Sequence, residues 1–263
     1  MSDARFINSS RVGDVVTLAL NRPEKLNALT PAVFAQLSEA IDAALAQGAR
    51  ALVLTGEGRF FCSGADIQPD GVGYEGLPRD LGALIDAAYN PFARKLAALE
   101  IPVVTALNGP CAGAGLSVAL AGDIVVMGES GYLLLAFVNI GLVPDAGATW
   151  LVARSAGRAR ALEMALLGER MGAAEAKAAG LVTRVVPDEA VLGEAQALAA
   201  RLAAGPTRAI GMIRRQVASA LEQGFDATLD IERDNQSIAG RSADFAEAIR
   251  AFGEKRKPDF SGR

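Results

Sequence analysis

Residues 108–123 read Asn-Gly-Pro-Cys-Ala-Gly-Ala-Gly-Leu-Ser-Val-Ala-Leu-Ala-Gly-Asp. The preceding segment, residues 101–107, is short and apolar like a strand, and the apolar residues after the glycines recur at helical spacing. Gly113 and Gly115 remove the Cβ barrier at the junction. The stretch therefore predicts a strand, a tight turn and a helix whose first amides have no partner within the helix.

A turn with so little side chain lets an oxygen atom of a ligand approach these amides, which lie at the positive end of the helix. We therefore expect the turn to hold an oxygen on which negative charge develops. Two other interpretations compete with this one. The turn could serve close packing alone. It could also be a dinucleotide loop, since residues 113–115 fit the first half of G-x-G-x-x-G, although Val118 replaces the third glycine.

The composition limits the class of protein. With 263 residues, 51% of them hydrophobic, the chain can form one large domain, or a core with an appendage. The net charge of −4, with both signs spread along the chain, argues against nucleic-acid or anionic-membrane partners. Residues 101–122 carry no charge and are long enough for a membrane span, but Pro102, Asn108 and the glycines favour a buried strand, turn and helix.

We expect a cytoplasmic protein. Residues 1–13 are polar and lack the apolar segment of a signal peptide. Cys62 and Cys111 do not form a disulfide framework. The chain contains no histidine, which excludes Ser/His/Asp and Cys/His triads and the zinc sites that need histidine. Two cysteines cannot form a four-cysteine site either, so we expect no metal, and any proton chemistry falls to Asp, Glu, Lys, Tyr or the backbone.

The apolar periodicity indicates strands alternating with helices, followed by a helical last quarter. Strands are expected at residues 15–20, 51–54, 101–107, 124–127, 132–135 and 182–186. Helices are expected at residues 31–47, 81–99, 158–167 and 173–179, and one after another from residue 188 to 252. Residues 70–79, with three glycines and a proline, are expected to form a mobile surface loop. The pattern predicts an α/β fold with mostly parallel strand pairing.

Several ordered motifs together resemble the crotonase (enoyl-CoA hydratase/isomerase) superfamily. They lie at residues 21–29, 61–67, 108–123, 140–150, 173–186 and 252–256. The resemblance implies an α/β, crotonase-type spiral of ββα units in residues 1–200 and a helical C-terminal trimerisation region in residues 201–263. It also implies a homotrimer or a dimer of trimers. The implied substrate is an acyl-CoA thioester, so no separate cofactor is expected because CoA is part of the substrate.

The resemblance also implies a set of site residues. The backbone amides of Ala65 and Ala114 match the positions that hold the thioester oxygen, as the two glycine-containing turns suggest independently. The residues expected to contact CoA are Lys25, Ser63, Ala65, Asp66, Ile67 and Lys257. Lys257 could reach the CoA of a neighbouring subunit. A solvated basic cluster is the competing interpretation for the lysines.

Three positions bear on the reaction. Ser117 and Phe137 stand where the hydratases of the superfamily carry glutamates, and neither can activate water. Asp145 stands where several isomerases carry their acid/base carboxylate, although Pro-Asp-x-Gly is also ordinary turn chemistry. We expect apolar neighbours, with Phe137, Val143 and Trp150 as candidates, to raise the pKa of Asp145.

The implied function is an isomerase of a CoA thioester. Residues 89–91, 141–145 and 231–244 are similar to the branch that converts ring-1,2-epoxyphenylacetyl-CoA to oxepin-CoA in phenylacetate degradation. Tyr89, Phe92, Phe137 and Trp150 could line a pocket for such an acyl group or pack in the core. The alternatives are a Δ3-Δ2 enoyl-CoA isomerase, an enoyl-CoA hydratase, a non-catalytic acyl-CoA binder and, more remotely, a nicotinamide-dependent dehydrogenase.

Overall fold

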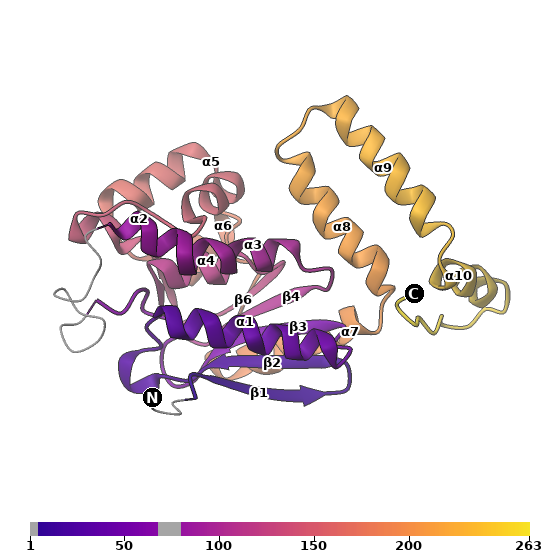
Figure 1. Ribbon diagram of the computed structural model, residues 1–263, viewed down its shortest axis with the longest axis horizontal. Helices are drawn as coiled ribbons and strands as arrows, with labels where there is room; N and C mark the ends of the chain where they lie inside the picture. Colours follow the sequence, from indigo (N-terminus) through magenta and orange to yellow (C-terminus); the bar gives the residue numbers. More distant parts are fainter. Residues whose placement is uncertain (1–4, 68–79) are drawn as a thin grey trace.

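The computed structural model describes residues 5–67 and 80–263, so the surface loop predicted at residues 70–79 lies outside the described residues. A six-stranded sheet forms the centre of the molecule (Figure 1). Its order is β1 (Ile7–Val12), β2 (Val15–Leu20), β3 (Ala51–Gly56), β4 (Val103–Leu107), β6 (Ile124–Gly128) and β9 (Arg184–Val186). Every neighbouring pair from β2 to β9 is parallel, and β1 runs antiparallel to β2. The predicted α/β class with mostly parallel pairing is confirmed.

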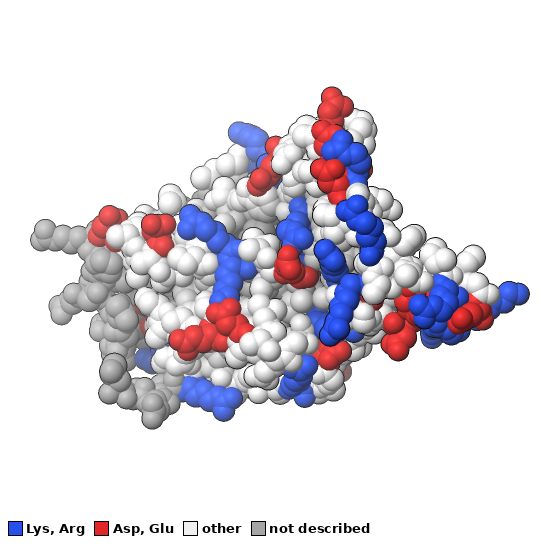
Figure 2. All heavy atoms as spheres, turned by 45° about the vertical axis from the view of Figure 1, so that its right-hand side comes forward, with Lys and Arg blue, Asp and Glu red and all other residues white. Residues whose placement is uncertain are grey.

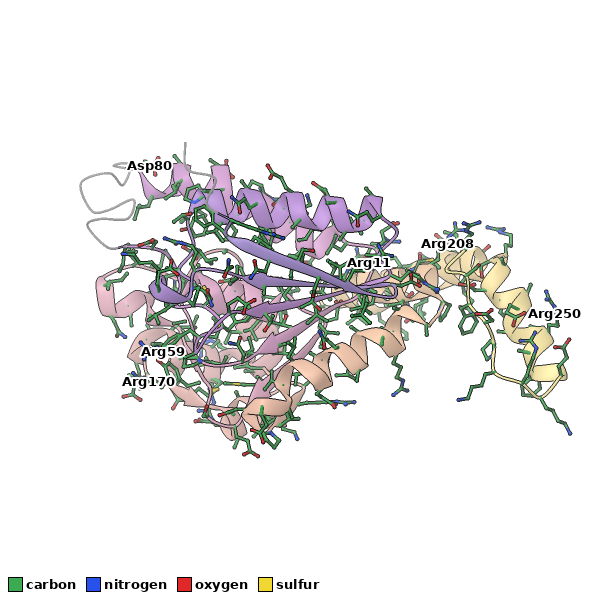
Figure 3. All side chains as sticks on the ribbon, turned by 90° about the horizontal axis from the view of Figure 1, so that it is seen from below. Arg11, Arg59, Asp80, Arg170, Arg208 and Arg250 are labelled. Atoms are coloured by element: carbon green, nitrogen blue, oxygen red, sulfur yellow. The ribbon has the colours of Figure 1, made fainter. Side chains whose placement is uncertain are left out.

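Helices cover both faces of this sheet. Alternate side chains of a strand point to opposite faces, so Leu52 and Leu54 of β3 join the core cluster beneath α1 (Pro31–Ala46), whereas Val53 packs with α7 (Val191–Ala203). Figure 3 shows these two helices on opposite sides of the strands. The sheet is thus buried between two layers, as parallel sheets usually are.

Helix α1 starts where its sequence predicts. The hydroxyl of Thr30 accepts a hydrogen bond from the amide of Val33 at 3.3 Å, and Pro31 occupies the first turn. The helix follows the turn after β2 and buries Phe34, Leu37 and Ile41 against the sheet.

The uncharged stretch around residue 110 forms the predicted strand, turn and helix inside the core. Strand β4 leads through β5 (Cys111–Ala112) into α4 (Ala114–Leu120), and every residue of α4 is buried. Strand β5 belongs to a small sheet with β7 (Tyr132–Leu134) and β8 (Met171–Gly172). Within residues 5–67 and 80–263, none of the helices is long and apolar enough to cross a membrane.

Two helical segments differ from the expected regular helices. The segment predicted at residues 81–99 consists of α2 (Leu81–Leu84), a π-helical turn (Ile85–Tyr89) and α3 (Asn90–Ala98). Helix α5 (Ala148–Leu167) begins well before the predicted start at residue 158 and is interrupted at Gly157, whose φ is +79°. Short 3-10 turns occur at Pro23–Lys25, Ala136–Ile140 and Asp188–Ala190, and α6 spans Ala173–Ala178.

The last helices extend away from the sheet as an arm. Helices α8 (Thr207–Ala220), α9 (Phe225–Ala239) and α10 (Ala243–Gly253) follow α7 (Figure 1). Arg214 of α8 donates from Nε to both carboxylate oxygens of Asp123, at 2.7 and 2.6 Å, and thereby ties the arm to the core. The proposed division at residue 200 stays a prediction; helix α7, which covers the sheet, runs across it to Ala203.

Candidate active site

The first glycine turn holds Ala65 between two hydrogen bonds to one residue. The amide of Leu29 donates to the carbonyl of Gly64 at 2.8 Å, and the amide of Asp66 donates to the carbonyl of Leu29 at 2.9 Å. Gly64 has a φ of +99°, which favours glycine. The amide between them, that of Ala65, has no acceptor in the described part of the chain and is available to a ligand.

The second glycine turn prepares Ala114 in the same way. Gly113, with a φ of +52°, precedes α4, and its amide donates to the carbonyl of Leu134 at 3.0 Å. Ala114 is the first residue of the helix, so its amide cannot bond to an earlier carbonyl of the helix. Among residues 5–67 and 80–263 this amide has no acceptor.

The two turns touch each other. The amide of Ala112 donates to the carbonyl of Cys62 at 2.9 Å. A Cβ added to Gly64 would lie 3.1 Å from the carbonyl oxygen of Ala112, and one added to Gly113 would lie 3.5 Å from the Cα of Gly64. The fold thus brings together the two turns that the sequence singled out, although they lie almost fifty residues apart.

The cysteines fill the space behind these turns. Cys62 and Cys111 are both buried and form no disulfide. A Cβ on Gly115 would lie 2.6 Å from the Sγ atom of Cys62, so Gly115 lets α4 pack onto the first turn. Burial raises the pKa of the Cys62 thiol to about 12 despite the hydrogen bond from Gly64, and it raises the pKa of Cys111 as well. Neither thiol is a nucleophile at neutral pH.

Asp145 lies on a strained turn before α5. The next residue, Ala146, has a φ of +49°, and Gly147 has a φ of +91°. The Oδ1 atom of Asp145 is buried and has no hydrogen-bond partner in the described structure. Burial raises the pKa of this carboxyl from 3.8 to about 6. A half-buried carboxyl that titrates near neutral pH fits a group that takes up and releases a proton.

Ser117 connects the glycine turn to Asp145. Its hydroxyl donates to the backbone carbonyl of Asp145 at 3.0 Å, and the amide of Ala148 donates to the same carbonyl at 2.9 Å. Ser117 and Phe137 are buried, so the two positions discussed for hydratases are core positions without a carboxylate. Sequence reasoning did not foresee that Ser117 positions the turn of Asp145.

The expected shielding of Asp145 by Val143 is wrong. Val143 is 79% exposed and so cannot remove the carboxyl from water. Trp150 is 38% exposed; it lines a groove of about 550 Å³ together with Ala146 and Gly147, and Asp145 itself does not line this groove. Of the three apolar candidates, Phe137 alone is buried.

An aromatic cluster lies near the site. Tyr89 is buried with its ring centroid 4.6 Å from that of Phe34, and the ring centroid of Phe92 lies 5.3 Å from that of Phe34. Burial, followed by the negative charges of Asp145, Cys62 and Asp66, raises the pKa of Tyr89 to about 12. The phenol is therefore neutral at physiological pH and close enough to Asp145 to sense its charge.

Asp66 makes an internal ion pair. Its carboxylate, 2% exposed, lies 2.9 Å from the Nη2 atom of Arg22. Arg22 also donates to the carbonyl of Ala28 at 2.6 Å and lies over the ring of Phe6. The expected role of Asp66 in CoA binding is left to its backbone, since its side chain is used within the protein.

Asn27 was also missed as a structural residue of the site. Its buried amide group donates to the carbonyls of Glu57 and Phe60 at 2.9 and 2.8 Å, and its Oδ1 atom accepts from the amide of Arg22 at 2.9 Å. The signal was present in the motif at residues 21–29, where polar residues stand between apolar ones. The sequence could not indicate their partners, which lie on other loops.

The expected CoA contacts divide into two groups. Lys25, Ser63, Ala65, Asp66 and Ile67 lie on two loops that touch, since the amide of Ser63 donates to a carbonyl in the first loop at 3.0 Å. Lys257 follows α10 on the arm, whereas these loops follow β2 and β3 at the other end of the molecule; Arg59 and Arg250 mark the two ends in Figure 3. One protomer therefore does not bring Lys257 to the other five residues.

Comparison with known proteins identifies the family of the chain. The family model for enoyl-CoA hydratase/isomerase matches residues 11–263. The 1,2-epoxyphenylacetyl-CoA isomerase of Escherichia coli (strain K12) is 45% identical over 98% of this chain and 99% of its own length. The 2,3-dehydroadipyl-CoA hydratase of the same organism is 35% identical over 97% and 98%, respectively. The crystal structure of an enoyl-CoA hydratase from Polaromonas sp. JS666 superimposes with a TM-score of 0.90 at 33% identity, covering 97% of this chain and 99% of that one.

The chain belongs to the enoyl-CoA hydratase/isomerase family and has the crotonase fold with a helical C-terminal region. It is an enzyme of the kind that acts on CoA thioesters. The relatives include both isomerases and hydratases, so the type of reaction depends on the residues of the site itself.

Proposed function

We propose that the protein is an isomerase that converts ring-1,2-epoxyphenylacetyl-CoA to oxepin-CoA in phenylacetate degradation. One observation carries the proposal: Asp145 presents a buried carboxylate oxygen without a partner, on a turn that Ser117 joins to the second glycine turn. Its pKa of about 6 suits a group that must both accept and return a proton. The similarity to the Escherichia coli isomerase supports the choice of substrate.

The roles follow from the chemistry of a thioester. The amides of Ala65 and Ala114 donate to the thioester oxygen and stabilise the enolate, an effect worth roughly 3 kcal/mol per donor in well-studied cases. Asp145 removes a proton from the carbon next to the thioester and returns a proton to a carbon of the ring. The carbon–carbon bond shared by the epoxide and the six-membered ring breaks as the ring expands, so the product is an isomer of the substrate.

Hydration is the less favoured reaction. Adding water needs one group to activate the water and another to supply a proton to carbon. Ser117 and Phe137 offer no carboxylate at the two positions considered for those groups, and the hydroxyl of Ser117 is already bonded to Asp145. The second candidate is a Δ3-Δ2 enoyl-CoA isomerase, because a single carboxylate and two amides suffice for that proton transfer as well.

We also infer how CoA and the subunits are arranged. Lys25, Ser63, Ala65, Asp66 and Ile67 would hold CoA on one protomer, with Asp66 acting through its backbone. Lys257 would reach it only from a neighbouring subunit of a homotrimer or of a dimer of trimers. CoA belongs to the substrate, and the proposed reaction uses no other cofactor and no metal.

Replacing the acid/base group tests the proposal. We expect Asp145→Asn to lose at least about 100-fold in kcat and to keep its affinity for CoA thioesters, since the amide cannot take up a proton. The measurement is a panel of ring-epoxide, 3-enoyl and 2-enoyl CoA thioesters followed by mass and ultraviolet absorbance.

Asp226→Asn is the matched control, since Asp226 lies in the first turn of α9 on the arm. Near-normal turnover by Asp145→Asn would remove the proposed mechanism. Efficient hydration of the 2-enoyl substrate by the wild-type protein would replace isomerisation with hydration.

A further inference from the structure

Tyr89 is a mostly buried phenol on which the charge of Asp145 acts. It ends the π-helical turn Ile85–Tyr89, and such turns often mark functional sites because they redirect a side chain. The side chain is 5% exposed, and its ring rests against Phe34 at a tilt of 50°. The phenol is therefore held in one orientation by packing.

The hydroxyl of Tyr89 and the carboxylate of Asp145 are both available to a ligand. Among the described residues, the hydroxyl has no hydrogen-bond partner, and the Oδ1 atom of Asp145 is buried without one. The Oδ1 atom is an exception to the rule that buried polar atoms are paired. The hydroxyl of Tyr89 is not one of the buried unpaired atoms, so a ligand can reach it. The charge of Asp145 acts on the phenol, so both groups belong to one region, and a bound ligand could satisfy both.

Two other protic side chains near the two turns are already used. The hydroxyl of Ser117 donates to the carbonyl of Asp145, and the thiol of Cys62 donates to the carbonyl of Asn27 at 3.1 Å. Ser63 on the first turn is assigned to CoA, which leaves Tyr89 as the neutral donor considered for an oxygen atom on the acyl group. Its raised pKa keeps it protonated over the working range of Asp145.

We propose that the hydroxyl of Tyr89 donates a hydrogen bond to the oxygen carried by the acyl ring and thereby selects oxygenated-ring thioesters over plain alkenoyl thioesters. The inference rests on the proposed function and adds the group that recognises the ring oxygen. Tyr89 keeps its proton throughout: the oxygen retains both of its bonds to carbon during ring expansion, and Asp145 carries the proton that moves. Tyr89 is therefore a specificity-determining residue.

The discriminating experiment compares two substrates in Tyr89→Phe. For the ring-epoxide thioester we expect kcat/KM to fall about 10- to 100-fold, because the site loses one donor and nothing replaces it. For a linear 3-enoyl thioester, which has no oxygen at that place, we expect a change within about twofold. Equal losses on both substrates, or no loss on either, would overturn the proposal.

Two control variants separate the hydroxyl from the packing. Phe92→Leu disturbs the same aromatic cluster without removing a hydroxyl, and we expect it to affect both substrates equally. Tyr132 on β7 carries a phenol that lies against Arg170. We expect Tyr132→Phe to change the activity with neither substrate. A substrate-selective loss in Phe92→Leu as large as that in Tyr89→Phe would also count against a role for the hydroxyl.

A binding measurement makes the test independent of turnover. In the Asp145→Asn background we expect 2-hydroxyphenylacetyl-CoA to bind more tightly than phenylacetyl-CoA, and Tyr89→Phe to abolish that preference. If Asp145→Asn retained turnover while the preference followed Tyr89, the proposed mechanism would fail and the inference would stand. If Asp145→Asn lost turnover and the preference were absent or independent of Tyr89, only the inference would fail.

Discussion

Asp145 gives the proposed reaction a defined pH dependence. Burial raises the pKa of its carboxyl to about 6, and the group must be ionised to accept a proton from carbon. We expect kcat to rise with pH through about 6 and to level off above it. Initial rates with saturating substrate from about pH 5 to about pH 8 provide the measurement. Tyr89 and Cys62 titrate near 12, so they do not contribute a limb in this range. A rate that decreases over the same interval would contradict the assignment.

The same carboxyl makes stability depend on pH in the opposite sense to most carboxylates. Its pKa in the folded state lies above the ordinary value of 3.8, so the folded protein binds more protons than the unfolded chain between about pH 4 and about pH 6. The charged form therefore destabilises the fold above that window. We expect Asp145→Asn to melt at a higher temperature than wild type near pH 8 and at nearly the same temperature near pH 4. Thermal melts of the two proteins side by side cancel the contributions of all other groups.

The buried pair of Arg22 and Asp66 fixes the turn that carries Ala65. Removing one partner leaves a charge in a site where the side chains are 14% and 2% exposed. We expect Asp66→Ala to lower the free energy of unfolding by about 3–5 kcal/mol, measured by urea denaturation. Asp42→Ala is the control, because Asp42 is 64% exposed in its pair with Lys95 and such pairs contribute about 0–1 kcal/mol. An equal loss in the free energy of unfolding for the two variants would show that burial does not determine how much the pair of Arg22 and Asp66 stabilises the fold.

Helix α5 is interrupted at Gly157, whose backbone conformation could not be predicted from the sequence pattern. Gly157 adopts a φ of +79° and a ψ of 165°, a region open almost exclusively to glycine, and nothing lies within 4 Å of an added Cβ. We expect Gly157→Ala to cost about 1–3 kcal/mol through backbone strain alone. Gly193→Ala in α7 is the control: it has equal space and an ordinary helical conformation, and it should gain about 0.5–1 kcal/mol. The two variants must differ in sign in thermal and urea unfolding.

The elements that could be predicted are those with a periodic or a capped sequence. Thr30 and Pro31 mark the start of α1, and the glycines before α4 mark its turn. Strand β1 was missed because it is an edge strand whose residues after Ile7 are mostly polar and exposed. The first half of α5 was missed because it lies between the glycine of a turn and Gly157.

The two glycine turns of the candidate site could be predicted because the residues of each turn follow one another in the sequence. Gly64 and Gly113 stand in motifs that can be read one residue after another, so both turns were found. The pair of Arg22 and Asp66 joins loops that are far apart in the chain, and such pairing leaves no periodic trace. The bond from Ser117 to Asp145 was hidden in the same way.

The arm of helices α8 to α10 carries an exposed apolar stripe. Phe245, Ile249 and Phe252 recur at helical spacing on α10 and are 50%, 59% and 86% exposed. An apolar stripe of this kind is typical of an interface. Figure 2 shows basic and acidic side chains mixed over the face that includes the arm, so no field of one sign opposes association there.

Changing this stripe tests the proposed assembly. We expect the wild-type protein to elute as a trimer or hexamer in size-exclusion chromatography with light scattering, and Phe252→Glu to shift it toward the monomer. Leu166→Glu serves as the control, because Leu166 is 65% exposed on α5, which is not part of the arm. A monomeric wild-type protein at micromolar concentration would refute the assembly, and an equal shift in both variants would assign it to another surface.

The hydroxyl of Ser117 has a consequence for ancestry. It stands at a position where the superfamily's hydratases are expected to carry a glutamate, and here it supports the bend that presents Asp145. A mutation that installs the glutamate removes this support before a second acid exists elsewhere. A lineage that changes one chemistry into the other by this route therefore gives up one of the two hydrogen bonds on the carbonyl of Asp145 at its first step and keeps the one from the amide of Ala148.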